Sequence, residues 1–148
     1  MLISLIFSIL CSGRTLIAFF KLVPFNKRDV LCSLIIAVPS ILIMLFYDKF
    51  DYRGMGPVLV GYAVIVSTML GKAVSMLFSS LNRTLKITIF VGALMFFLSD
   101  LSLLFYQFAS GGIVARAFCL FLYYPSCIVL AITPIISIYE KKKLEKAV

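Results

Sequence analysis

Five long apolar runs, each close to the length of a membrane span, constrain this chain more than any other feature of its sequence. About 20 apolar residues, rising 1.5 Å each, are needed to cross a hydrocarbon core of ~30 Å. The runs therefore predict an all-α, polytopic membrane helix bundle with about five transmembrane helices. The predicted spans are Leu2–Val23, Val30–Tyr47, Pro57–Phe78, Ile87–Tyr106 and Ala117–Ile138.

The amino-acid composition leads to the same fold class. Of the 148 residues, 63% are hydrophobic and 14% are charged, and a soluble domain of this length could not bury so much apolar surface. The connecting segments are short, so they leave no room for a separate soluble domain. We expect residues 1–148 to form a single transmembrane helical domain, with a basic tail over residues 139–148.

Lysine and arginine are unequally divided between the two sides of the predicted bundle. Cytoplasmic loops of membrane proteins carry the excess of these residues. The division predicts an extracytoplasmic N-terminus and a cytoplasmic C-terminus, and the net charge of +8 needs no nucleic-acid partner. In a five-span arrangement one side holds Lys27, Arg28, Arg83, Lys86, Lys141, Lys142, Lys143 and Lys146, and the other holds Lys49, Arg53 and Arg116.

The residue types that most often bind metals or act as nucleophiles are sparse. The chain contains no histidine, and its four cysteines all lie within apolar runs without a Cys-x-x-Cys pair. A zinc site needs a cluster of such ligands, and Ser-His or Cys-His catalysis needs the histidine. The sequence therefore predicts no metal site and no cofactor, and we interpret the cysteines as small buried apolar residues.

Three ionisable residues lie inside the predicted spans, namely Arg14, Lys72 and Asp100. Each costs at least ~2.5–3.5 kcal/mol at the centre of a membrane helix, so a functional role is the first hypothesis for each. Arg14 follows Ser-Gly and marks either a break in the first span or a wet crevice. Lys72 is long enough for its ammonium group to reach the interface. Asp100 is either an ion-pair partner of Lys72 or Arg14, or a neutral acid.

Three apolar segments of the sequence contain distinctive residue patterns. The central segment is GALMFFLSDLSLLFYQF, which places Ser-Asp in the middle of a helix. It is preceded by GPVLVGYAVIVSTMLGKA and followed by LFLYYPSCIVLAITP, with a pair of tyrosines. In this order the three segments, over about Gly56 to Pro134, resemble helices of the YhhN family, which includes the lysoplasmalogenases. Members of the family are longer and carry a Gly-Asp motif in an earlier helix, and no Gly-Asp occurs in this sequence.

The resemblance implies cleavage of the vinyl-ether bond of a lysoplasmalogen, giving a fatty aldehyde and glycerophosphocholine or glycerophosphoethanolamine. Asp100 would be the catalytic acid, and Tyr62 would hydrogen-bond Asp100 or the attacking water. Tyr123 and Tyr124 would face a quaternary ammonium head group, although packing or interfacial roles are the alternative for all three tyrosines. Lys72 and Arg14 are further candidates for substrate binding.

Two other functional classes remain open. One is a non-catalytic membrane protein that binds lipid or assists another membrane protein, and the other is a transporter. Broken helices in repeated halves would indicate a transporter, and no internal repeat is evident in the sequence. For the hydrolase and for the non-catalytic protein, the expected partner is a membrane lipid or a lysophospholipid substrate. Gly61, Gly71 and Gly92 are expected to allow close contact between helices.

Overall fold

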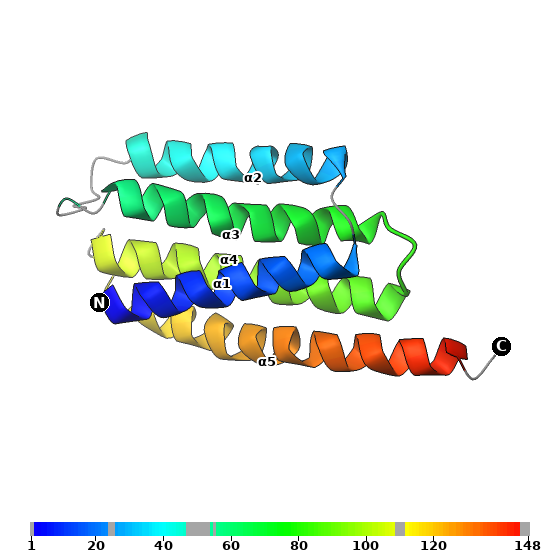
Figure 1. Cartoon of the computed structure of the whole chain (residues 1–148). Coiled ribbons are helices and arrows are strands. Elements are labelled where there is room, and N and C mark those ends of the chain that lie inside the picture. The colour runs from blue at the N-terminus through cyan, green and yellow to red at the C-terminus, as the bar shows by residue number, and fades with distance from the viewer. Residues whose placement is uncertain (1, 24–25, 47–53, 55, 109–111, 146–148) are drawn as a thin grey trace.

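In a computed structural model, the described residues of the protein form a bundle of five α-helices (Figure 1). The structure describes residues 2–23, 26–46, 54, 56–108 and 112–145, and within these ranges the regular elements are all helices. This confirms the predicted all-α bundle. The helices are α1 (Leu2–Leu22), α2 (Lys27–Phe46), α3 (Gly56–Leu77), α4 (Arg83–Phe108) and α5 (Gly112–Glu145).

Four helices among the described residues are long and apolar enough to cross a membrane, which makes the chain a multi-pass membrane protein. These four segments are Lys27–Phe46, Gly56–Met76, Arg83–Phe108 and Gly112–Thr133. Helix α1 coincides with the first predicted span but is not one of the four. Its crossing of the membrane therefore stays a prediction.

Several helices extend beyond the spans that hydropathy predicts: α4 begins at Arg83 rather than at Ile87, and α5 begins at Gly112 rather than at Ala117. Helix α2 begins at Lys27 rather than at Val30, so its first turn includes Asp29. Helix α5 continues to Glu145, which makes residues 139–145 a helical extension rather than a tail separate from the last helix. Hydropathy detects only the apolar part of a helix, whereas Lys, Glu and Leu have high helix propensity and extend the helix beyond it.

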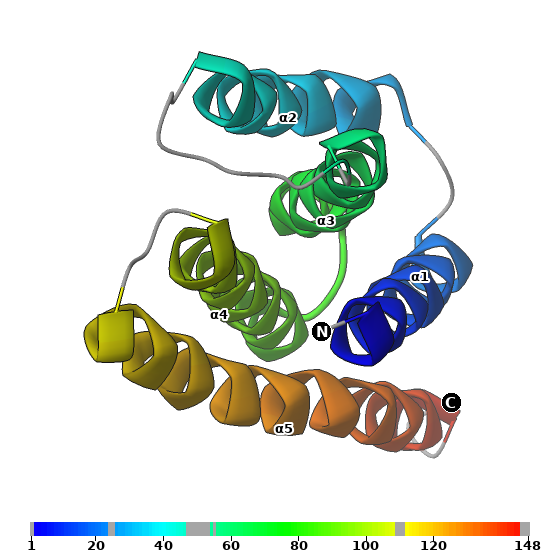
Figure 2. The same cartoon turned by 90° about the vertical axis from the view of Figure 1, so that its left-hand side faces the viewer.

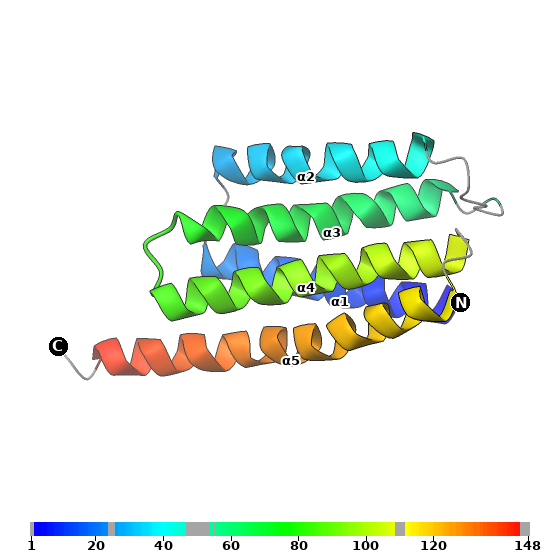
Figure 3. The same ribbon diagram turned by 180° about the vertical axis from the view of Figure 1, so that it is seen from behind.

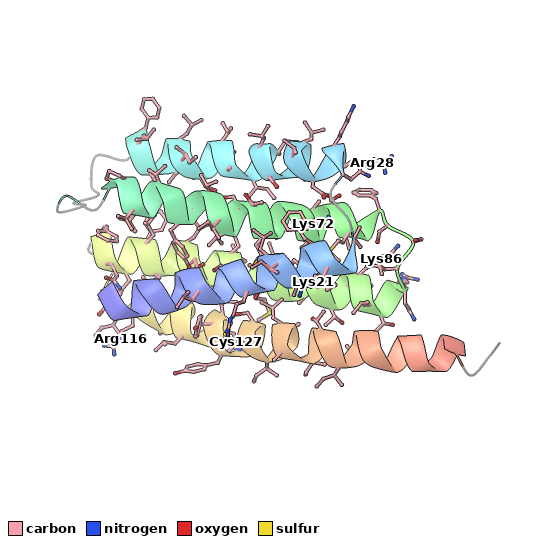
Figure 4. The ribbon with its side chains drawn as sticks, viewed as in Figure 1. Lys21, Arg28, Lys72, Lys86, Arg116 and Cys127 are labelled. Atoms are coloured by element: carbon pink, nitrogen blue, oxygen red, sulfur yellow. The ribbon has the colours of Figure 1, made fainter. Side chains whose placement is uncertain are left out.

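Helices α2, α3, α4 and α5 follow one another as antiparallel neighbours, and α1 packs against α3 (Figure 2). Helices α1, α3 and α5 end at one end of the bundle, where α2 and α4 begin, and the last turns of α5 project beyond the others (Figure 3). We call this end the basic end, because Lys21, Arg28 and Lys86 lie toward it while Arg116 lies at the opposite end (Figure 4).

The core lies where α1, α3, α4 and α5 meet. Its fully buried side chains come mainly from one face of α3 and the facing side of α4, while the outer surfaces of α2 and α5 remain exposed and apolar. This arrangement suits a bundle whose surroundings are hydrocarbon. The buried core residues are Phe19, Tyr62, Val66, Met69, Leu70, Ala73, Met76, Leu85, Ile89, Ala93 and Phe96.

Of the three glycines expected to allow close helix contact, Gly71 and Gly92 lie where two helices meet. A Cβ atom built on Gly71 would come within 2.5 Å of the Ser33 backbone on α2, and one built on Gly92 would come within 3.0 Å of Val129 and Leu130 on α5. A Cβ atom on Gly61 would meet no atom within 4 Å. The expectation was therefore wrong for Gly61, which lies on an exposed face of α3.

A buried ion pair joins α2 to α3 near the basic end. The Lys72 ammonium nitrogen lies 2.5 Å from Asp29 Oδ2, and the two side chains are 0% and 4% exposed. The backbone N–H of Asn26 donates a second hydrogen bond to the same oxygen at 3.0 Å. The Phe20 ring of α1 lies over the ammonium, 5.0 Å from its centroid, so three helices meet around one neutralised charge pair.

The distribution of basic residues predicts that the basic end faces the cytoplasm. We expect an impermeant maleimide to label Ile113→Cys in intact cells and Ser80→Cys only after permeabilisation, in a background whose native cysteines are alanine. Ser80 is exposed between α3 and α4 at the basic end, and Ile113 is 84% exposed at the start of α5. The reverse labelling pattern would overturn the predicted orientation.

Substitution of the two α3 glycines should have opposite effects on stability. Gly71→Ala puts a methyl group into the Ser33 backbone, and overpacking of this kind lowers the free energy of unfolding by about 1–3 kcal/mol. Gly61→Ala enters open space and should raise it by about 0.5–1 kcal/mol, because alanine favours the helix. Denaturant titration in detergent micelles measures both, and equal effects would contradict the close approach of α2 and α3.

The ion pair predicts a non-additive pair of substitutions. Lys72→Met leaves the Asp29 carboxylate buried without a cation, which should destabilise the fold by about 3–5 kcal/mol. Adding Asp29→Asn removes the stranded charge and should recover most of that loss, because neutral replacements of a buried pair are well tolerated. Arg28→Met, at an exposed neighbouring position, should change stability by less than about 0.5 kcal/mol. A double variant as unstable as Lys72→Met would argue against the pair.

Candidate functional site

Asp100 and Tyr62 form a hydrogen-bonded pair between α4 and α3. The Tyr62 hydroxyl donates to Asp100 Oδ2 at 2.6 Å. Tyr62 is 8% exposed within the core, and Asp100 is half-buried. The antiparallel packing of α3 and α4 creates this pair, because it brings residues 38 positions apart in the sequence to the same level. Of the two partners considered for Tyr62, Asp100 and the attacking water, the structure pairs it with Asp100.

The residues beside Asp100 attach the same turn of α4 to α5. Ser99 is wholly buried, and its hydroxyl donates to the Cys119 carbonyl at 3.0 Å. One turn earlier on α4, the Phe96 ring packs against Tyr123, with centroids 6.0 Å apart. Contacts on both sides thus fix the rotation of α4, and this rotation directs Asp100 toward α3 while Ser99 faces α5.

Neither predicted cation lies beside Asp100. Lys72 is paired with Asp29 instead of reaching an interface, and Arg14 is exposed on a helix that runs without a break from Leu2 to Leu22. A break in the first span, which was one of the two alternatives for Arg14, is therefore wrong. In the described part of the chain, Asp100 makes no ion pair and its hydrogen-bond partner is Tyr62, so the alternative of a Lys72–Asp100 or Arg14–Asp100 pair is wrong as well.

The two adjacent tyrosines of α5 have different surroundings. Tyr123 is half-buried between Phe96 and Tyr124. The rings of Tyr123 and Tyr124 meet edge to face, with centroids 6.0 Å apart, and Tyr124 is 63% exposed. Tyr123 therefore serves packing at least in part, whereas Tyr124 presents an aromatic surface outward.

Asp29 is the polar residue that sequence reasoning missed. Hydropathy placed it in a loop, because it follows the charged stretch Asn-Lys-Arg. The available signal was topological: consecutive membrane helices are antiparallel, so the first turn of α2 must face the end of α3, where Lys72 lies. On α3, Lys72 binds Asp29 and Tyr62 binds Asp100. These two α3 residues are ten positions apart, about 15 Å along a helix. The Asp29 and Asp100 carboxyl groups therefore belong to separate sites.

Metal-binding residues do not gather anywhere in the described ranges. No group of three or more His, Cys, Asp or Glu side chains there could hold a metal ion. Cys32 and Cys127 are half-buried, Cys119 is buried, and all three are free thiols. Two carboxyl side chains in these ranges meet a polar side chain of another helix, in the Asp100–Tyr62 pair and the Asp29–Lys72 pair.

Comparison with known proteins gives one match. The sequence matches the YhhN family over residues 15–133, which include Asp29, Tyr62, Lys72 and Asp100. No curated protein matches the chain, and no solved structure matches it. The family match covers most of the 148 residues, so the chain belongs to the YhhN family.

Proposed function

We propose that this protein is a membrane-embedded hydrolase of the lysoplasmalogenase type. Its substrate would be a lysoplasmalogen, and its products a fatty aldehyde and glycerophosphocholine or glycerophosphoethanolamine. The observation that carries the proposal is the Asp100 carboxyl group, which lies inside a membrane-spanning helix and has the Tyr62 hydroxyl, not a cation, as its partner. Membership of a family that includes lysoplasmalogenases supports it.

The reaction needs one acid in apolar surroundings. A carboxylic acid transfers a proton to the vinyl carbon remote from the ether oxygen, which leaves an oxocarbenium ion at the carbon bearing the oxygen. Water adds to that carbon and loses a proton, and the resulting hemiacetal collapses to aldehyde and alcohol. A carboxyl group without a cationic partner, away from water, suits the first step because it can hold a proton at neutral pH.

The hydrogen bond of Tyr62 fits both forms of such an acid. In the neutral form, Tyr62 donates to Oδ2, which leaves Oδ1 to carry the transferable proton. After transfer, the same hydrogen bond stabilises the carboxylate, whose negative charge lies near the oxocarbenium ion. The carboxylate can then accept the proton released by the attacking water, which restores the acid. Tyr62 is thus proposed as a positioning residue and Asp100 as the catalytic residue.

The aromatic residues of α5 are proposed to bind the head group. Tyr124 is 63% exposed, and a quaternary ammonium group over its ring would gain a cation–π contact. Tyr123 holds that ring edge to face and lies one turn along α5 from Cys119, whose carbonyl meets the Ser99 neighbour of Asp100. Lys72 and Arg14 carry no role here, because Lys72 is paired with Asp29 and Arg14 lies outside the matched residues.

The alternative is a non-catalytic membrane protein that binds lipid or assists another membrane protein. One observation favours it. Hydrolysis would gain from a second carboxylate that holds the attacking water. The other carboxylate described within a membrane-spanning segment is that of Asp29, which is bound to Lys72. Lys72 lies about 15 Å along α3 from Tyr62, the partner of Asp100. An assay for aldehyde release separates the two functions.

The hydrolase proposal predicts loss of activity on replacement of Asp100. Purified protein in lipid nanodiscs is given a lysoplasmalogen, and free aldehyde is measured. Asp100→Asn keeps the size and can still accept the hydrogen bond from Tyr62, but it has no acidic proton, so the rate should fall about 10²–10⁴-fold. Tyr62→Phe should lower the rate about 10–100-fold, since a hydrogen bond to a charged group is worth about 1.5–3 kcal/mol.

Ser102→Ala is the matched control, because Ser102 lies on the same helix and its hydroxyl bonds only the Leu98 carbonyl of that helix. It should release aldehyde at the wild-type rate. All variants should melt within a few degrees of the wild type in detergent, so that lost activity is not lost folding. Undiminished aldehyde release by a folded Asp100→Asn protein rejects the catalytic role of Asp100, and a wild type that releases none favours the non-catalytic alternative.

A further inference from the structure

Helix α2 lies at the edge of the bundle and packs against α3 (Figure 2), but its two halves are attached in different ways. The first half is held by the ion pair of Asp29 with Lys72. It is also held by the close approach of the Ser33 backbone to Gly71, which leaves no room for a Cβ atom there. The half of α2 toward the basic end is therefore fixed on α3.

The second half of α2 follows Pro39, which lies inside the helix. Proline has no backbone N–H, so the carbonyl of Ile35 loses its usual helical hydrogen bond. The next carbonyl, that of Ile36, accepts a hydrogen bond from the Ser40 hydroxyl at 2.8 Å. A proline, and a serine that bonds back into its own helix, are both causes of helix bending. Pro39 therefore marks a hinge position between the two halves.

Beyond the hinge, Met44 is the residue that anchors α2 to the helices beside it. It is 4% exposed and packs with Leu59 of α3 and Phe108 of α4. Lipid chains are as apolar as leucine, so the outer side of this segment loses little when the segment moves within the bilayer. The large apolar residues of that outer side are 44–77% exposed, namely Leu42, Ile43, Leu45 and Phe46.

The Met44 contact closes the seam between α3 and α4 beside Asp100. Leu104, one turn along α4 from Asp100, and Ala63, which follows Tyr62 on α3, both pack against the Met44 cluster. Asp100 itself is half-buried. A vinyl ether must come within hydrogen-bond reach of the carboxyl group to be protonated, so the chain of a lipid substrate has to enter this seam.

We propose that residues 40–46 of α2 form a lateral gate to Asp100. Bending at Pro39 withdraws Met44 from the seam between α3 and α4, and the alkenyl chain of a lysoplasmalogen enters from the lipid in its place. An unbranched, flexible methionine suits this position, because it can fill the seam when no chain is there. The gate rests on the proposed hydrolase function, whereas the bending of α2 is measurable without any activity.

Distances between spin labels test whether the second half of α2 moves. Labels are placed at Leu45→Cys and Leu98→Cys, on the exposed sides of α2 and α4, with the native cysteines replaced by alanine. The protein in lipid nanodiscs is given a saturated 1-O-alkyl lysophospholipid, which has no vinyl bond to protonate. This analogue should populate a distance about 3–4 Å longer, the displacement that a bend of ~20° gives a helical segment of ~10 Å.

Two controls show whether the hinge is at Pro39. Labels at Leu31→Cys and Ile87→Cys, exposed positions of the same two helices near the basic end, should keep one distance, because the first half of α2 is fixed. Pro39→Ala restores a helical hydrogen bond and should lower the longer population of the first pair about fivefold, the effect of one hydrogen bond on an equilibrium. Pro125→Ala, which removes a proline from within α5, should leave that population unchanged.

Aldehyde release then connects the movement to the reaction. A substrate that binds only the open form meets only the open fraction of the protein. Pro39→Ala should therefore lower kcat/KM by the same factor by which it lowers the longer population in a sub-saturating amount of the analogue. Met44→Ala removes the anchor and should raise both quantities. Melting in detergent verifies that both variants are folded.

Several results would overturn the gate. A Leu45–Leu98 distance that does not respond to the analogue, or a response equal to that of the Leu31–Ile87 pair, would reject it whether or not the wild type releases aldehyde. An unchanged population in Pro39→Ala would reject the hinge. Movement in a wild-type protein that releases no aldehyde would leave the hinge in place and reject its role as the entrance to a hydrolase site.

Discussion

Hydrocarbon around the bundle is the constraint on which the rest of the structure depends. A polar group inside such a bundle has no water to bond and must find its partner in the protein. Buried hydroxyls of Ser40, Ser126 and Thr133 meet this demand by donating to carbonyls three or four positions earlier in their own helices. Ser67 is the exception, because its buried hydroxyl has no hydrogen-bond partner among the described residues.

The same constraint makes α3 the centre of the bundle. Lys72 bonds Asp29 on α2, Tyr62 bonds Asp100 on α4, and Phe19 of α1 packs into the core around them. Each contact ties a different helix to α3, so this one helix helps to position α1, α2 and α4. The orientation of Asp100 therefore depends on the rotation of α3 as well as on the contacts that Ser99 makes with α5.

Hydropathy alone could predict the helix class and the approximate spans, because crossing a membrane requires long apolar runs. It could not predict Asp29 as part of the core, since a carboxylate at the end of an apolar run resembles a loop residue until its partner is known. Nor could it separate Gly71 from Gly61, because one faces α2 and the other faces outward. Such distinctions depend on the rotation of each helix about its axis. When a helix is apolar on all sides, its hydropathy does not show which side faces the bundle.

The two carboxyl groups of the described membrane segments show how a partner determines what the same residue type can do. Asp29 has an ammonium group at 2.5 Å and a backbone N–H at 3.0 Å, so its charge is balanced and a proton would have to displace Lys72. Asp100 has a phenol as its partner and no cation among the described residues. Releasing or accepting a proton there disturbs no ion pair. Asp29 is therefore suited to holding α2 against α3, and of the two, Asp100 is the one suited to proton transfer.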